Sequence, residues 1–374
     1  MARNGMAAII AALVMIVMAG PGRAQNAYIS NMADNTVSVI DTATNSVTAT
    51  IPVGAQPFAV AVPQHGGRAY VGNQGDDTVS VIDTATNIVI ATIPVGGIPT
   101  GVVVTPDGSK AYVGVGVVDD STIAAIDTAS NTVTAILPNF GYPAALAMTP
   151  DGGKYYVVAR SGTGGFFDVF STTEDTGPFG SALGNNQLIF QFYGVVAVPP
   201  DGGKAYATAR GGLVVAYSVT NSAPYFSLAT AITGIQTNQH FPYGVAATPD
   251  GGRVYVGDLN GNTVAAIDIA SNTVIGALIP VGNNPSGVSV TPDGSKVYVA
   301  NSRSNNVSVI STATNAVIAT IPVGNSPQAF GQFIGPAPVL VPIPVPGPGT
   351  GGLLLGALLL GAAGAYHVTR RKAA

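Results

Sequence analysis

The chain has 374 residues, of which 47% are hydrophobic and 9% charged, with 48 Gly, 27 Pro, no Cys and no Trp. This length can bury a large core, and the low charge argues against a solvated disordered chain. Without Cys there is no disulfide, no thiolate-bound zinc, no iron–sulfur cluster, no cysteine nucleophile and no c-type haem. All 18 acidic residues lie between Asp34 and Asp293, so the body has a net charge of −9 and nucleic acid is not expected as a partner.

Residues 1–24 have the three-part form of a secretory signal peptide. Arg3 precedes an apolar run from Met6 to Ala19, which is followed by Gly20-Pro21-Gly22 and a small-residue context ending at Ala24. This pattern predicts export and cleavage before Gln25. An uncleaved anchor is the alternative, although the apolar run is short for a membrane span.

Residues 25–335 repeat one unit seven times. The unit contains a tyrosine that recurs at spacings of 42, 42, 44, 50, 49 and 43, at Tyr28, Tyr70, Tyr112, Tyr156, Tyr206, Tyr255 and Tyr298. Each copy holds four short runs rich in Val, Ile, Thr and Tyr, separated by turn residues such as Thr105-Pro106-Asp107-Gly108. A period in the forties with four strands per copy predicts an all-β, seven-bladed β-propeller of four-stranded antiparallel blades.

The first and last copies indicate how the ring closes. The first copy, at Tyr28, begins with the second strand of its blade, because signal peptide precedes it. The missing strand is expected at Gln328–Phe333, after the seventh copy. A C-terminal strand that completes the first blade would remove exposed edges.

The repeats resemble those of the YVTN-family β-propellers, found in archaeal surface-layer proteins and exported bacterial proteins. The matching tetrads are Tyr28-Ile29-Ser30-Asn31, Tyr70-Val71-Gly72-Asn73 and Tyr298-Val299-Ala300-Asn301, together with the recurring Pro-Asp-Gly turns. The resemblance implies a seven-bladed propeller and a surface or scaffold role, while activity must be argued from a site.

The C-terminal end has three further parts. Residues 336–349 form a Pro- and Gly-rich spacer, residues 350–369 carry no charge, and residues 370–374 hold Arg370-Arg371-Lys372. The uncharged segment would span roughly 28 Å as a helix, enough for one transmembrane helix with a basic cytoplasmic tail. This end resembles the PEP-CTERM sorting tails, which a membrane protease removes; Gly347 stands where that family has Glu. The expected location is therefore periplasmic or at the cell surface, anchored by this helix unless it is processed.

Half of the acidic residues belong to turns of the repeat, and their expected role is hydrogen bonding to nearby backbone. They are Asp41, Asp83, Asp107, Asp127, Asp151, Asp201, Asp250, Asp268 and Asp293. The pairs Asp76-Asp77 and Asp119-Asp120 lack the ligand spacing of a calcium loop, and no metal or other cofactor is expected.

Blades four and five depart from the repeat and supply the candidate ligand site. Arg160 and Arg210 replace the usual Asn at equivalent positions of neighbouring blades. The connections between blades at the same end contribute Tyr142, Tyr193, His240, Phe241 and Tyr243. Two guanidinium groups beside aromatic rings suit an anionic or sugar-like ligand. In the alternative, Arg160 and Arg210 pair with Asp168 or Asp258 and the rings fill the blade junctions.

These patterns favour an exported, monomeric, non-enzymatic binding or scaffold protein. The expected partners are a surface polysaccharide, a small anionic ligand or a protein. An extracytoplasmic lactonase or hydrolase with its site on blades four and five is the alternative. A quinone-cofactor propeller is disfavoured by the absence of Trp and Cys and by the presence of only three His.

Overall fold

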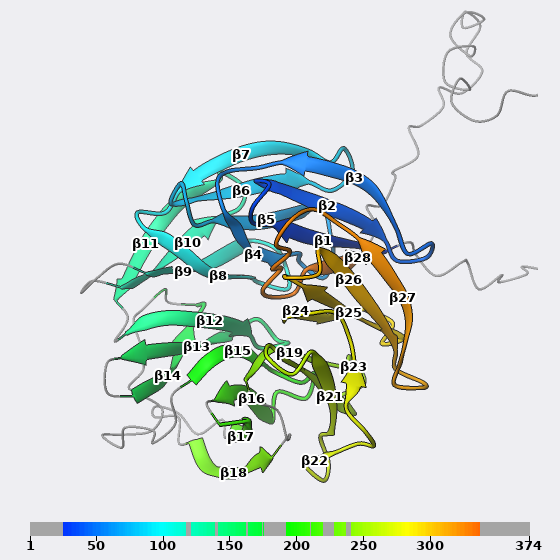
Figure 1. The fold of residues 1–374 in the computed structure, drawn as a ribbon. Coiled ribbons are helices and arrows are strands. Elements are labelled where there is room, and N and C mark those ends of the chain that lie inside the picture. The colour runs from blue at the N-terminus through cyan, green and yellow to red at the C-terminus, as the bar shows by residue number, and fades with distance from the viewer. Residues whose placement is uncertain are drawn as a thin grey trace, which may run out of the picture. The chain divides into compact units, whose positions relative to one another are not determined.

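The computed structural model describes residues 25–116, 121–138, 141–161, 164–173, 175, 192–209, 211–219, 228–236 and 241–336. These residues belong to one compact unit, Met1–Pro338. Their strands form seven antiparallel sheets placed like blades around a central axis (Figure 1). The predicted seven-bladed β-propeller is therefore confirmed.

Each blade runs outward from an innermost strand. The innermost strands, for blades 1 to 7, are β28 (Ile334–Pro336), β4 (Pro57–Ala61), β8 (Ile98–Val104), β12 (Tyr142–Met148), β15 (Phe192–Ala197), β19 (Pro242–Ala247) and β24 (Pro285–Val290). The second strands are β1 (Gln25–Asn31), β5 (Arg68–Asn73), β9 (Lys110–Gly116), β13 (Lys154–Ser161), β16 (Lys204–Ala209), β20 (Arg253–Asp258) and β25 (Lys296–Asn301).

The third strands are β2 (Thr36–Asp41), β6 (Thr78–Asp83), β10 (Thr122–Asp127), β14 (Gly164–Ser171), β17 (Leu213–Val219), β21 (Thr263–Asp268) and β26 (Asn306–Ser311). The outermost strands are β3 (Ser46–Pro52), β7 (Ile88–Pro94), β11 (Thr132–Pro138), β18 (Leu228–Gln236), β22 (Thr273–Val274) with β23 (Ile279–Pro280), and β27 (Ala316–Pro322). Blade 4 has three described strands, and the outermost strand of blade 6 is interrupted between β22 and β23, which both pair with β21.

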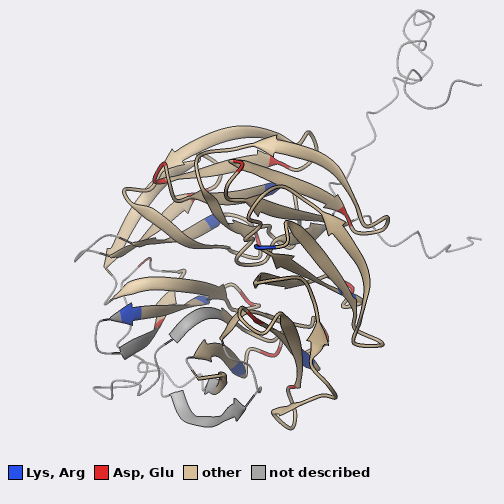
Figure 2. Ribbon diagram, in the orientation of Figure 1, with Lys and Arg blue, Asp and Glu red and all other residues tan. Residues whose placement is uncertain are grey.

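The core lies between the blades. The second strands are buried on both faces, and the seven repeat tyrosines are each at most 1% exposed. The outermost strands alternate, as in β7, where Ile88 is 60% exposed and Ile93 is 3% exposed. Neighbouring blades cover both faces of a sheet, which explains why polar alternation is weak in the sequence. Figure 2 shows few charged residues within the strands.

The ring has two ends, which we call the turn face and the loop face. The turn face holds the turns that join the first to the second strand and the third to the fourth. The predicted turn bonds are present there, since Asp107 Oδ1 accepts from the backbone amide of Ser109 at 3.0 Å and Asp41 Oδ1 from that of Ala43 at 2.7 Å. The loop face holds the hairpins between the second and third strands and the connections between blades.

The C-terminal part of the ring completes blade 1, as predicted, but with a different register. Regular pairing with β1 occurs at β28, where Gln25 lies opposite Pro336. The expected strand, Gln328–Phe333, instead bonds to two blades at once. The backbone amide of Gln328 donates to the carbonyl of Ser30 in blade 1, and that of Val60 in blade 2 donates to the carbonyl of Phe330. Residues Gln328–Phe333, which we call the closing segment, therefore lie between blades 1 and 2 and join them through backbone hydrogen bonds.

Candidate functional site

Arg160 and Tyr142 lie together at the loop face of blade 4. They are cross-strand partners at the ends of β13 and β12, and the Arg160 guanidinium carbon lies 5.9 Å from the centre of the Tyr142 ring. Tyr142 is 37% exposed, and its ring lies against Gly116 of blade 3, where a Cβ atom would come within 2.2 Å of it. A cation over a tyrosine face is a stabilising contact.

Tyr243 of blade 6 belongs to the same neighbourhood. Burial raises the pKa of its hydroxyl, and the positive charge of Arg160 opposes that rise. Arg160 and Tyr243 therefore lie close enough for the charge of one to act on the other. We call Tyr142, Arg160 and Tyr243 the Arg160 site.

The other predicted site residues are placed only in part. Tyr193 lies in β15, and its side chain lies outside the described residues, as do Arg210 and His240. Phe241 is described, and its backbone amide donates to Asp258 Oδ1 at 3.0 Å. Of the seven residues predicted for the site, the structure therefore brings together Tyr142, Arg160 and Tyr243.

The predicted ion pair between Arg160 and Asp168 is wrong. Asp168 lies opposite Val157 in the β13–β14 register, three residues from Arg160, and so projects to the other face of the sheet. It is fully buried, and neither carboxylate oxygen has a hydrogen-bond partner among the described residues. Burial raises its pKa to about 7. Asp258, 1% exposed, accepts from the backbone amides of Phe241 and Asn260.

Three aromatic rings, those of Phe58, Tyr243 and Phe330, form a cluster at the axis of the propeller. Phe330 stacks on Phe58 of blade 2 with ring centres 4.3 Å apart and meets the Tyr243 ring edge-on at 4.8 Å. Blades 2 and 6 are not neighbours, so these contacts pass through the centre of the ring. Phe58 and Phe330 were not among the residues predicted for the site, although Phe58 lies in an innermost strand and Phe330 in the segment that closes the ring.

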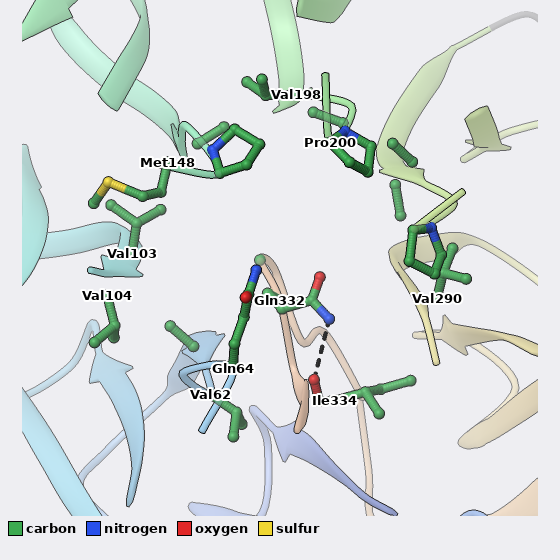
Figure 3. A pocket seen from close by; sticks show the side chains of 18 of the residues that line it. Val62, Gln64, Val103, Val104, Met148, Val198, Pro200, Val290, Gln332 and Ile334 are labelled. Atoms are coloured by element: carbon green, nitrogen blue, oxygen red, sulfur yellow. Dashed lines mark hydrogen bonds between the residues drawn. The ribbon is translucent and has the colours of Figure 1, made fainter. Parts of the chain in front are cut away.

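A cavity of about 580 Å³ occupies the axis toward the turn face (Figure 3). The innermost strands line it with Val, Ala, Leu and Met side chains, and a ring of turn prolines continues the lining. Gln64 and Gln332 project into it, and Gln332 Nε2 donates to the carbonyl of Ile334 at 3.1 Å. No lining residue has an ionisable side chain. This lining suits binding of an apolar group.

Neither a metal site nor a membrane-spanning helix is found in the described part of the chain. No group of three or more His, Asp or Glu side chains there is placed to hold a metal ion. No helix there has the length and apolar character to cross a membrane. The predicted signal peptide, spacer, transmembrane helix and basic tail lie outside the described residues.

The architecture and the axial cavity define a seven-bladed β-propeller. No model of a known protein family matches the chain, and no curated protein matches its sequence. A solved chain titled Kuenenia stuttgartiensis hydrazine synthase is similar, with 26% identity and a TM-score of 0.66, over 76% of this chain and 92% of that one. So is a functionally unknown protein from Desulfotomaculum acetoxidans, with 16% identity and a TM-score of 0.64, over 82% of this chain and 99% of that one. The second likeness shows the fold alone.

Proposed function

We propose that this protein is an exported, surface-associated propeller that binds its ligand without catalysing a reaction. Its ligand is an anionic or sugar-like group of a surface polysaccharide, a small molecule or a protein partner. The observation that carries the proposal is the Arg160 site, a half-buried guanidinium held over a partly exposed tyrosine ring at the loop face. Aromatic faces and guanidinium groups are the usual partners of sugars and carboxylates.

The described residues of this site suit binding. A hydrolase needs a general base whose pKa lies near neutrality, and neither Arg160 nor the two described tyrosines supply one. Burial raises the pKa of the neighbouring Tyr243 hydroxyl above its ordinary value, so it remains a hydrogen-bond donor at neutral pH. The same hydroxyl can then bind a sugar or carboxylate oxygen. The lactonase or hydrolase alternative gains no comparable support.

Export with cleavage before Gln25 is compatible with the limits of the ring. Gln25 pairs with Pro336 of β28, so this cleavage would leave every described strand in place. The protein recovered from the cell envelope should begin at Gln25, as mass spectrometry of its N-terminal peptide would reveal. Recovery of the intact N-terminus from the cytoplasm would contradict export.

The ligand class is tested by titrating the chain of residues 25–338, which holds every described strand and lies within the compact unit, with polygalacturonate and with neutral dextran. The proposal expects polygalacturonate to bind and Arg160→Ala to weaken its binding about tenfold or more. Arg303→Ala is the matched control, because Arg303 is exposed on the loop face of blade 7. Equal losses in both variants, or none in Arg160→Ala, would reject the site.

A further inference from the structure

The axial cavity is a second place where this ring can hold a ligand, at the opposite ends of the innermost strands from the Arg160 site. In blade 4, for example, Tyr142 begins β12 at the loop face, and Met148 ends it among the residues that line the cavity. Its volume of about 580 Å³ lies within the range of about 300–1,000 Å³ that is typical of small-molecule sites. The cavity is therefore large enough to hold a small-molecule ligand.

The inner end of the cavity is narrowed by the closing segment. Gly331, which lines it, has a φ of 104°, and a Cβ atom there would come within 2.7 Å of the Val60 carbonyl oxygen. The neighbouring Phe330 ring packs between Phe58 and Tyr243. A ligand would therefore enter from the turn face and lie with its inner end toward these rings.

Most side chains of the cavity walls are apolar, and two glutamines and three threonines are the polar ones. Val62, Val104, Val198 and Val290 are among the side chains around the space in Figure 3. The Gln332 amide nitrogen is held by the Ile334 carbonyl, which leaves the amide oxygen toward the cavity (Figure 3). An apolar chain in this space would cover the Val, Leu and Met side chains and remove them from water, which is favourable.

The mouth of the cavity is acidic. Three lining threonines donate to turn carboxylates, Thr149 to Asp151 at 2.6 Å, Thr248 to Asp250 at 2.5 Å and Thr291 to Asp293 at 2.5 Å. Each carboxylate is therefore one hydrogen bond away from the lining. Hydrogen bonds within the turns lower the pKa of Asp151 and Asp250, so both are ionised at neutral pH.

The charges of Lys154 and Arg253 lower the pKa of Asp151 and Asp250, although Arg253 donates to the Thr312 carbonyl of the next blade. Three lysines near these turns are engaged elsewhere. Lys204 Nζ donates to the Ile269 carbonyl at 2.5 Å, and Lys296 Nζ donates to the Thr42 carbonyl at 2.6 Å, both in the outer hairpin of the next blade. Lys110 pairs with Asp175 at 2.5 Å in the same way. The outward placement of these cations leaves a negative field at the mouth of an apolar cavity, which attracts positive charge.

We infer that the axial cavity binds an amphipathic cation, with an alkyl chain between the innermost strands and a cationic end at the turn aspartates. The chain is recognised by apolar burial and the charged end by the carboxylates. A fully neutral chain would gain only the first contribution, and an anion would be repelled at the mouth. This site is separate from the Arg160 site and takes a ligand of opposite charge.

The test is calorimetric titration of the chain of residues 25–338 with three probes that share a ten-carbon chain: decyltrimethylammonium, decanol and decanoate, all below micelle formation. The cation should bind about tenfold or more tightly than decanol and more tightly still than decanoate. The advantage should shrink between about 0.05 M and about 0.5 M salt, since salt screens exposed charges. Equal affinities for cation and anion would overturn the inference.

Two pairs of variants locate the binding. Val104→Phe, on the half-buried lining, should abolish binding of the cation, while Val317→Phe on the outer surface of β27 should not. Asp151→Asn should weaken binding of the cation and leave binding of decanol unchanged. Asp41→Asn, in an outer turn of the same face, should change the affinity for neither probe. Thermal unfolding of each variant verifies the fold. Cation binding that survives both Val104→Phe and Asp151→Asn would overturn the inference.

Discussion

The Tyr298 hydroxyl donates to the Oδ1 atom of Asn45 at 2.6 Å and so joins blade 7 to blade 1. The same latch recurs around the ring, between Tyr206 and Asn272 at 2.8 Å and between Tyr255 and Asn315 at 2.7 Å. Each tyrosine is fully buried in its own blade, and each asparagine lies in the outer hairpin of the next. The latch thus ties the core of one blade to the edge of its neighbour.

Tyr298→Phe should lower the free energy of unfolding by about 1–2 kcal/mol, because it removes one buried hydrogen bond and leaves the ring packed. Tyr155→Phe is the control, since the buried Tyr155 hydroxyl has no hydrogen-bond partner among the described residues and its loss should cost less. Denaturant unfolding of both variants gives the comparison. Equal losses of unfolding free energy in the two variants would show that the hydrogen bond between Tyr298 and Asn45 does not stabilise the ring.

Asn45→Ala should cost more than Asn45→Gly. Asn45 has a φ of 53°, a conformation that Gly adopts freely and Ala does not, so Gly removes only the side chain of the latch. The difference between the two variants in urea unfolding isolates the backbone contribution, about 1 kcal/mol. Equal unfolding free energies for the two variants would mean that the hairpin changes its backbone conformation to accept Ala.

A chain ending at Pro338 should fold as well as the full chain, whereas a chain ending at Gly324 should not. The shorter chain loses β28 and Phe330, so β1 loses its inner partner and Phe58 loses its stacking partner. Light scattering and thermal unfolding would show aggregation and a lower midpoint for the shorter chain. Matching midpoints would contradict the closing role of this segment.

Asp168 should make the ring less stable as the pH rises. Its folded pKa is raised to about 7 by burial, above the unfolded value of about 3.9, so its protonated form is favoured in the fold. Its contribution therefore falls as the pH rises from about 4 through about 7, and the part lost above about pH 5 is on the order of 3 kcal/mol. Asp168→Asn should remove this dependence. A parallel pH profile for both proteins would show that Asp168 stays ionised in the fold.

The sequence predicted the fold because the signals of the repeat are local. Tyrosine spacing, Pro-Asp-Gly turns and Asn at hairpins each constrain a few neighbouring residues, and seven consistent copies specify the ring. The latches were not predicted, since Tyr298 and Asn45 meet only once the rotation between blades is known. The closing strand was predicted at Gln328–Phe333, yet Phe330 lies toward the axis and regular pairing occurs at Ile334–Pro336.

The candidate site was predicted less completely. Equivalent positions in the repeat placed Arg160 at the loop face beside Tyr142, which the sequence also indicated. The alternative partner, Asp168, failed because strand alternation places it on the other face of the sheet. The axial cavity depends on seven innermost strands meeting, which no single copy of the repeat reveals.

Hydrogen–deuterium exchange of the ring with and without polygalacturonate tests the central claim most directly. A ligand at the Arg160 site should slow amide exchange at the loop-face ends of β12 and β13, around Tyr142 and Arg160. Exchange at the Pro-Asp-Gly turns of the opposite face should stay unchanged. Protection confined to those turns, or no protection at Tyr142 and Arg160, would contradict binding at the loop face.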